Sequence, residues 1–181
     1  KDMTTWTQPF SYKYVDAITT ASPLGLLKQG APVSQLPSLL NMFVGDRAGC
    51  LGETCTLALL LGGIYLVARK VISPVIPLCY LGTAAVLSAC MGRNVLIDLL
   101  SGGLMLGAIF MATDYTTSPM TVKGQIIYAI GCGVVTMLIR NFGNLPEGVS
   151  YAIVLMNILV PLIDSGTRPV AFGKEPSKNE T

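Results

Sequence analysis

The chain has 181 residues, of which 51% are hydrophobic and only 12% are charged, and its formal net charge is +2. Soluble domains carry about 25% charged residues, so the composition excludes an ordinary soluble domain, and the small net charge without a basic run excludes a nucleic-acid partner. The sequence contains no histidine, the most common general base and metal ligand. We therefore predict neither a catalytic residue nor a metal site.

Residues 1–53 are predicted to form a polar connecting region without a spanning segment. Repeated prolines argue against long helices here, at Pro9, Pro23, Pro32 and Pro37. The stretch of residues 36–44 is amphipathic, and we expect it to lie at the membrane interface or to re-enter the membrane. The start of the chain does not resemble a signal peptide, which suggests the C-terminal part of a longer protein.

Residues 54–166 are predicted to form a membrane domain of about five spanning segments, followed by a polar C-terminal tail at residues 167–181. The apolar segments comprise residues 54–68, 71–92, 95–113, 124–139 and 148–163. The second contains no charged residue over the length of about 20 residues that crosses a bilayer. The last two are short, and we expect them to extend through Arg140 and Asp164. The predicted fold class is an all-α integral membrane protein, a polytopic helix bundle.

Small residues inside the apolar segments indicate where helices touch. Gly103 and Gly107 form the G-x-x-x-G pattern, which lets two membrane helices approach closely. The sequence has no C-x-x-C pair, so we interpret the cysteines inside apolar segments as packing residues; they are Cys79, Cys90 and Cys132.

A cluster of hydroxyl side chains ends the third apolar segment. The sequence DYTTSPMT runs from Asp114 to Thr121. Composition alone favours a boundary loop, because Ser-Pro promotes a turn and hydroxyls bond their own backbone. The lack of an activating base argues against a hydrolytic threonine, and the lack of a Gly-rich cradle argues against a phosphate loop. Residues 16–24, DAITTASPL, echo the Asp, the threonine pair and the Ser-Pro, which suggests an internal repeat or two related sites.

Four long motifs resemble the family formed by the D subunit of the Rnf electron transport complex (RnfD) and, more distantly, the B subunit of the sodium-translocating NADH:quinone reductase (NqrB). They occupy residues 15–24, 51–77, 101–125 and 140–164, with Thr-Arg-Pro following at 167–169. The resemblance covers essentially the whole chain. It implies a urea/ammonium transporter-like fold of two inverted five-helix halves, of which this chain supplies the second half and the connecting loop.

The resemblance also implies a covalent flavin in the hydroxyl cluster. In this family a threonine carries FMN through a phosphoester bond, attached by a flavin transferase whose target reads Ser-Gly-Ala-Thr or Thr-Gly-Ala-Thr. Alignment on Asp114 places this threonine at Thr121, three residues after Ser118, and Thr117 is the alternative. The two residues between Ser118 and Thr121 depart from the target pattern. We expect Thr116, Thr117 and Ser118 to bind the phosphate or the ribityl chain.

A second, non-covalent flavin, riboflavin or FMN, is implied near the loop of residues 15–24. We expect Asp16, Thr19 and Thr20 to contribute to this second site.

The implied protein is a flavin-carrying, multi-pass subunit of the bacterial cytoplasmic membrane. It would pass electrons between ferredoxin-side and NAD-side carriers, coupled to Na⁺ or H⁺ translocation, as one part of an ion-translocating ferredoxin:NAD⁺ oxidoreductase. Expected partners are the other Rnf subunits (A, B, C, E and G), the flavin transferase and membrane lipid. Two alternatives stay open: a solute channel of the urea-transporter type and a structural scaffold. Asp98 is interpreted as either a coupling carboxylate or a surface pair with Arg93.

Overall fold

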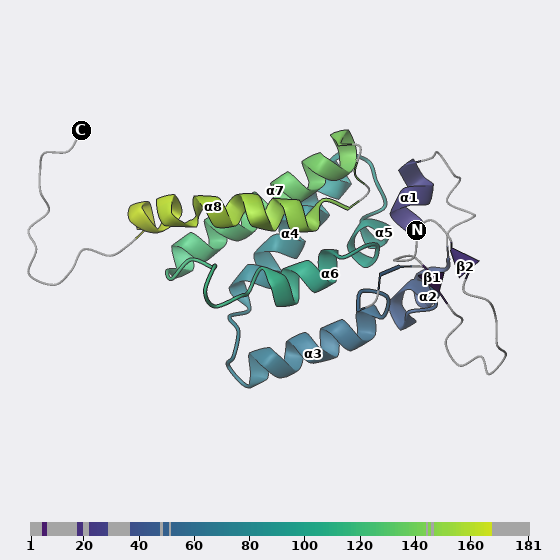
Figure 1. The fold of residues 1–181 in the computed structure, drawn as a ribbon, viewed down its shortest axis with the longest axis horizontal. Coiled ribbons are helices and arrows are strands. Elements are labelled where there is room, and N and C mark those ends of the chain that lie inside the picture. Colours follow the sequence, from purple (N-terminus) through teal and green to yellow (C-terminus); the bar gives the residue numbers. More distant parts are fainter. Residues whose placement is uncertain are drawn as a thin grey trace, which may run out of the picture.

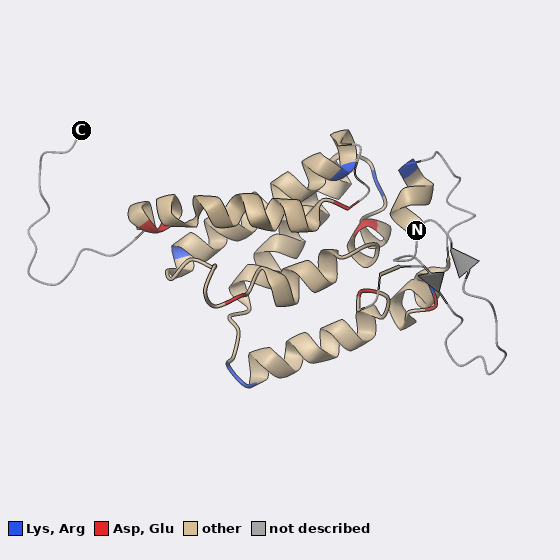
Figure 2. Cartoon of the chain, in the orientation of Figure 1, with Lys and Arg blue, Asp and Glu red and all other residues tan. Residues whose placement is uncertain are grey.

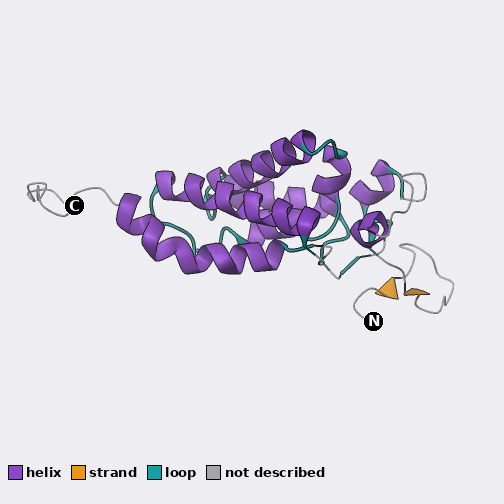
Figure 3. Ribbon diagram, turned by 90° about the horizontal axis from the view of Figure 1, so that it is seen from above, coloured by secondary structure: helices purple, strands orange, loops and turns teal. Residues whose placement is uncertain are grey.

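The computed structural model describes residues 5–6, 18–19, 22–28, 37–47, 49–50, 52–143, 145 and 147–167, and this part of the chain is helical apart from two short strands. The strands β1 (Thr5–Trp6) and β2 (Ile18–Thr19) pair antiparallel. The helices, drawn in Figure 1, are α1 (Pro23–Lys28), α2 (Leu39–Val44), α3 (Thr56–Ala68), α4 (Val75–Cys90), α5 (Val95–Leu100), α6 (Leu104–Leu106), the π-helix η3 (Gly107–Met111), α7 (Val122–Phe142) and α8 (Val149–Thr167). Figure 3 shows that the two strands lie beyond one end of the helices.

The amphipathic stretch predicted before the first span forms the short helix α2. The hydroxyl of Ser38 caps it by accepting a hydrogen bond from the amide of Asn41, and Gly45 ends it with a left-handed φ of 109°. Met42 is buried, whereas Leu40 and Val44 are 75% and 53% exposed, so the outward side of α2 is apolar, and its position at the membrane interface stays a prediction.

α7 and α8 are long and apolar enough to cross a membrane. They have 21 and 19 residues, and a 20-residue helix spans about 30 Å, the thickness of the hydrocarbon core. Arg140 lies in the last turn of α7 and Asp164 in the last turn of α8. The extension of these two helices through their terminal charges is therefore confirmed. α3 and α4 are shorter apolar helices of 13 and 16 residues.

The third apolar segment, predicted as one continuous span, is broken. Between α5 and α6 the chain leaves the helical path at residues 101–103. Gly102 has a φ of 64°, which favours glycine, and an added Cβ would lie 2.9 Å from Cδ1 of Leu24, which would have to shift. In η3 the amide of Ala112 bonds to the carbonyl of Gly107, one residue further back than in an α-helix.

α7 packs against both α4 and α8, and these three helices contain most of the buried core. Tyr80 of α4 and Tyr128 of α7 are fully buried, and the Tyr80 hydroxyl is 2.6 Å from the hydroxyl of Thr136. Close approach depends on small residues, since a Cβ on Gly133 would lie 2.8 Å from Cβ of Thr83.

The structure tests two predictions about small residues: close approach at Gly107 and packing of the cysteines in apolar segments. Gly107 is a close-approach position, because an added Cβ would overlap the side chain of Val149. Cys132 is buried in the core, which confirms its interpretation as a packing residue, and Cys79 packs against that core. Cys90 is exposed at the end of α4, so the interpretation is wrong for this residue.

The outer faces of the helices carry large apolar side chains, whereas most charged side chains lie near the helix ends. Ile64 of α3, Leu78 of α4 and Ile158 of α8 are 64%, 69% and 69% exposed. Figure 2 shows that the lysines, arginines, aspartates and glutamates of the described residues lie mainly at helix ends and in connecting loops. This distribution suits a hydrocarbon environment around the middle of the helices and an aqueous one at their ends.

Candidate functional site

Thr121 is the N-cap of α7. Its hydroxyl accepts a hydrogen bond from the amide of Gly124 at 3.0 Å and donates one to the hydroxyl of Thr167 in α8 at 2.8 Å. Such a cap contributes about 1 kcal/mol to helix stability. Gly124 has no room for a side chain, because an added Cβ would lie 2.9 Å from Cβ of Pro119. Thr121 is half-buried, and its hydroxyl bonds both to the first turn of α7 and to the last turn of α8.

Asp114 organises the exposed part of the same loop. Its carboxylate accepts hydrogen bonds from Oγ1 of Thr116 at 2.6 Å and Oγ1 of Thr117 at 3.2 Å, and its carbonyl accepts one from the amide of Ser118. These hydrogen bonds, that of Thr116 foremost, hold the pKa of Asp114 below its ordinary value. The structure thus brings the four predicted residues Asp114, Thr116, Thr117 and Ser118 together, while the hydroxyl of Thr121 belongs to a separate network.

The end of α8 closes this loop. The carboxylate of Asp164, which is 6% exposed, accepts a hydrogen bond from the amide of Met120 at 3.3 Å. The side chain of Gln125 donates to the carbonyl of Pro119 from the other side. Sequence reasoning missed the contacts of Asp164 and Thr167 with the loop, because both residues lie more than 40 positions away along the chain. The only signal was a carboxylate near the end of an apolar segment.

The second predicted group is described only in part. Asp16 and Thr20 lie outside the described residues, and Thr19 is described only as a residue of β2, opposite Thr5. The next described residue is Ser22, whose hydroxyl accepts a hydrogen bond from an amide in the first turn of α1 at 3.3 Å.

α1 lies near the C-terminal end of α7 (Figure 1), whereas Thr121 caps the opposite, N-terminal end of that helix. The amino group of Lys28 donates to the carbonyl of Leu145, just after α7, at 2.5 Å. Leu24 packs on the helix break at Gly102. Ser22, the described residue just before α1, therefore lies near the opposite end of α7 from Thr121, and the structure does not bring these two hydroxyls together.

Two arginines bind the carbonyl end of α5 at the helix break. Nη1 of Arg140 donates to the carbonyl of Asp98 at 2.7 Å, and Nη2 donates to that of Ser101 at 3.2 Å. Arg47 donates to the carbonyl of Leu100. Both arginines are 2% exposed. Carbonyls freed inside a membrane protein need internal partners, and these guanidinium groups supply them.

Two glutamates lie on the other side of the break, where α6 begins. The Oε2 atoms of Glu53 and Glu147 are 3.0 Å and 3.8 Å from the position that a Cβ on Gly103 would take. Burial, and then the charge of Glu53, raises the pKa of Glu147. Both glutamates and Tyr151 line a cavity of about 300 Å³. Two guanidinium groups against two carboxylates leave this cluster with balanced charge.

Asp98 fits neither sequence interpretation in full. It pairs with Arg93, as one interpretation predicted, with N–O distances of 2.8 Å to both carboxylate oxygens. However, the carboxylate is 2% exposed and also accepts a hydrogen bond from the hydroxyl of Ser88 at 2.6 Å. The Asp98 carboxylate is therefore buried, and its hydrogen bond with Ser88 links α5 to α4, whereas the side chain of Arg93 is 28% exposed. The hydrogen bond to Asp98 raises the pKa of Arg93.

Two helices long enough to cross a membrane, apolar outer faces and a broken helix with buried charges indicate a helical membrane protein. The chain belongs to the NQR2, RnfD, RnfE family, whose model matches residues 1–173. It is 51% identical to the D subunit of the Na⁺-translocating ferredoxin:NAD⁺ oxidoreductase complex of Acetobacterium woodii, over 91% of this chain and 52% of that protein.

Two further relatives carry related names. The D subunit of the proton-translocating ferredoxin:NAD⁺ oxidoreductase complex of Clostridium ljungdahlii is 46% identical over 94% of this chain and 56% of that protein. The D subunit of the ion-translocating oxidoreductase complex of Stutzerimonas stutzeri is 47% identical over 76% of this chain and 41% of that protein. The chain thus spans about half the length of these curated relatives.

Proposed function

We propose that this chain is part of the flavin-carrying membrane subunit of an Rnf-type ferredoxin:NAD⁺ oxidoreductase. The subunit passes electrons between ferredoxin-side and NAD-side carriers while the complex moves Na⁺ or H⁺ across the bacterial cytoplasmic membrane. The observation that carries this proposal is the family match over residues 1–173, with relatives named as the D subunits of such complexes. One relative is named for Na⁺ and another for protons, so either ion is compatible with the family.

The proposed architecture is the second of two inverted five-helix halves, as in urea and ammonium transporters, with residues 1–53 as the connecting loop. The broken helix α5–α6 supports it, because discontinuous helices with internally satisfied ends are typical of inverted-repeat membrane proteins. The other Rnf subunits and a flavin transferase are the proposed partners.

We place covalent FMN on Thr121. The supporting observation is its position at the start of α7, where unpaired amides and the helix dipole favour a phosphate. The exposed side chain of Lys123 adds a positive charge next to it, and the exposed Tyr115 and Met120 offer apolar surface to the ring. A phosphoester removes the proton of the Thr121 hydroxyl, so the hydrogen bond to Thr167 is lost while the bond from Gly124 is retained. Bound FMN would supply one- and two-electron transfer.

Besides Thr117, Ser22 is a second alternative attachment residue. The transferase target has Ser or Thr first, Gly second, Ala third and Thr fourth, and Thr19 to Ser22 read Thr-Thr-Ala-Ser. This stretch matches the target at its first and third positions and offers a serine hydroxyl at the fourth. The proposed non-covalent flavin would then lie elsewhere than at Asp16, Thr19 and Thr20.

A substitution series distinguishes these hydroxyls. The complete natural chain is co-expressed with its flavin transferase, and covalent flavin is read as fluorescence of the protein band on a denaturing gel. We expect Thr121→Asn to abolish the fluorescence without loss of folded protein, because Asn caps helices as well as Thr but cannot form the ester. Thr117→Ala and Ser22→Ala should retain it. Loss of fluorescence in Ser22→Ala alone would move the attachment to Ser22, just before α1, and loss in Thr117→Ala alone would move it to Thr117. Absence of flavin from the wild-type chain would refute the flavin proposal.

A further inference from the structure

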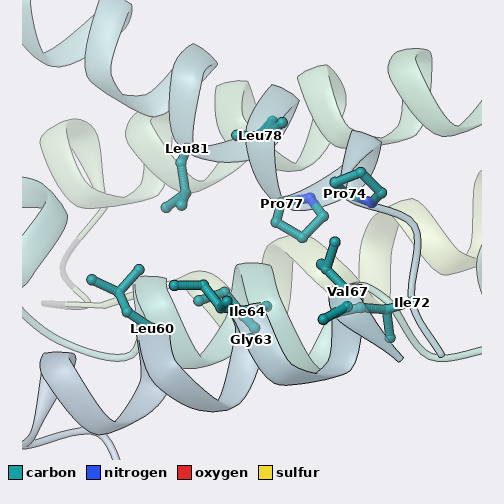
Figure 4. A pocket seen from close by; sticks show the side chains of 11 residues that line it. Leu60, Gly63, Ile64, Val67, Ile72, Pro74, Pro77, Leu78 and Leu81 are labelled. Atoms are coloured by element: carbon teal, nitrogen blue, oxygen red, sulfur yellow. The ribbon is translucent and has the colours of Figure 1, made fainter. Parts of the chain in front are cut away.

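An apolar groove separates α3 from α4 on the outer surface of the described helices. Its volume is about 370 Å³. Figure 4 shows Ile64 and Val67 of α3 on one wall and Pro77, Leu78 and Leu81 of α4 on the other. Ile109 of η3 also lines it.

The groove exists because α3 packs on η3 and not directly against the neighbouring part of α4. An added Cβ on Gly63 would lie 2.8 Å from Cγ2 of Ile109, and one on Gly62 would lie 3.1 Å from Cζ of Phe110. The two glycines therefore seat α3 tightly on η3. As a result, Ile64 and Leu78 face the groove with 64% and 69% of their surface exposed.

The lining decides which chemical class fits this groove. Every side chain that lines it is apolar, from leucine, isoleucine, valine, alanine, proline and glycine. A flavin ring or an ion would leave its polar groups without hydrogen-bond partners here, which is costly. A saturated hydrocarbon chain has no such requirement, and the volume lies in the range of ligand sites.

Positive charge lies at one end of the groove. Ala68 and Ile72 both line it, and the turn between them carries Arg69 and Lys70, both exposed. Figure 2 shows this positive turn at the end of α3. Lys70 adopts a left-handed φ of 57°, a conformation that glycine or asparagine would accept more readily. Lys70 therefore places a positive charge at this end of the groove although its backbone conformation is unfavourable for lysine.

We propose that the groove binds one acyl chain of an anionic phospholipid, whose phosphate pairs with Arg69 and Lys70. Apolar walls and a cationic end match the two parts of such a lipid, since a long apolar chain follows directly on a charged headgroup. The groove does not depend on the flavin assignment, because none of its residues belongs to either hydroxyl-rich loop.

Lipid retention tests the site. The complete chain is purified in detergent, stripped of lipid and incubated with phosphatidylglycerol or with phosphatidylcholine, and bound lipid is counted by native mass spectrometry. We expect one retained phosphatidylglycerol, in at least fivefold excess over phosphatidylcholine. Arg69→Gln with Lys70→Gln should remove that excess. Leu78→Trp, which fills the groove, should lower retention of both lipids at least fivefold.

Ile158→Trp is the matched control, because Ile158 on α8 is as exposed as Leu78. It should retain phosphatidylglycerol like the wild type. Equal retention by the Leu78 and Ile158 variants would overturn the proposal, as would a wild-type chain without lipid preference.

A photo-crosslinking amino acid at position 78 identifies the occupant directly and needs no large change in packing. In native membranes we expect a crosslink to phospholipid. A crosslink to a protein segment instead would show that another helix fills the groove, and it would refute the lipid site.

Discussion

Arg140 is 2% exposed near the end of α7 and donates its hydrogen bonds to backbone carbonyls. The acceptors in α5 and at its C-cap, the carbonyls of Asp98 and Ser101, lost their helical partners when the chain broke at Gly102. A buried carbonyl left without a partner costs about 1–3 kcal/mol. Arg140 is therefore a structural cation that makes the helix break tolerable.

We expect Arg140→Met to lower the free energy of unfolding by about 3–5 kcal/mol, because it leaves carbonyls unpaired and only Arg47 to balance the two glutamates. Thermal unfolding of the complete chain in detergent can be followed by far-UV circular dichroism, since the described residues are largely helical. Lys123→Met removes an exposed cation from the first turn of the same helix and should leave the midpoint unchanged. Equal midpoints for the two variants would contradict the role of Arg140.

At the scale of whole elements, apolar length predicted the long helices but not the break. α7 and α8 follow from runs of apolar residues that end in a charge. Residues 95–113 have the same appearance, with Asp98 as their only charge. Their break depends on the φ of Gly102 and on Arg47 and Arg140, which lie far away in the sequence. A local pattern carries no information about such long-range partners.

The break itself can be tested at Gly102. Gly102→Ala should destabilise the chain by at least about 1–2 kcal/mol, the cost of a left-handed residue with a Cβ, because the added Cβ also approaches Leu24. Gly82→Ala is the control, since Gly82 lies within α4 with open space around it and a helical alanine is favoured. An unfolding midpoint for Gly102→Ala at or above that of Gly82→Ala would show that the break is not conformationally demanding.

Glu147, whose side chain lies at the start of α6, predicts that the stability of the fold depends on pH. The pKa of Glu147 is raised in the folded state by burial and by Glu53, so the folded chain holds this proton more tightly than the unfolded chain. This contribution to stability is fully present below the ordinary glutamate pKa of about 4.3 and is lost as the pH rises through the raised pKa.

Relative to Glu147→Gln, the wild type should therefore gain thermal stability as the pH is lowered from 7 toward 5. The difference between the two midpoints, measured across this range, isolates Glu147 from other titrating groups. A difference that stays constant, or changes in the opposite direction, would contradict the raised pKa.

At the scale of the whole molecule, Thr121 caps the start of α7, whereas Ser22, just before α1, lies near the other end of α7, about 30 Å away if the helix is straight. The sequence predicted the cluster from Asp114 to Thr121 but not its closure by Asp164 and Thr167, nor the pairing of glutamates from two distant loops. These features depend on how α8 returns along α7, which no motif encodes. If α7 crosses the membrane, Thr121 and Ser22 lie toward opposite sides of it.

Peptide mass spectrometry of the flavin-loaded chain tests the central claim most directly. Cleavage before aspartate and after lysine releases residues 114–123 and residues 16–28 as separate peptides, one from each loop. We predict that the peptide of residues 114–123 carries the mass of one FMN phosphoester and that fragmentation places it on Thr121. FMN on the peptide of residues 16–28, with residues 114–123 unmodified, would contradict the assignment, and two unmodified peptides would contradict covalent flavin in this chain.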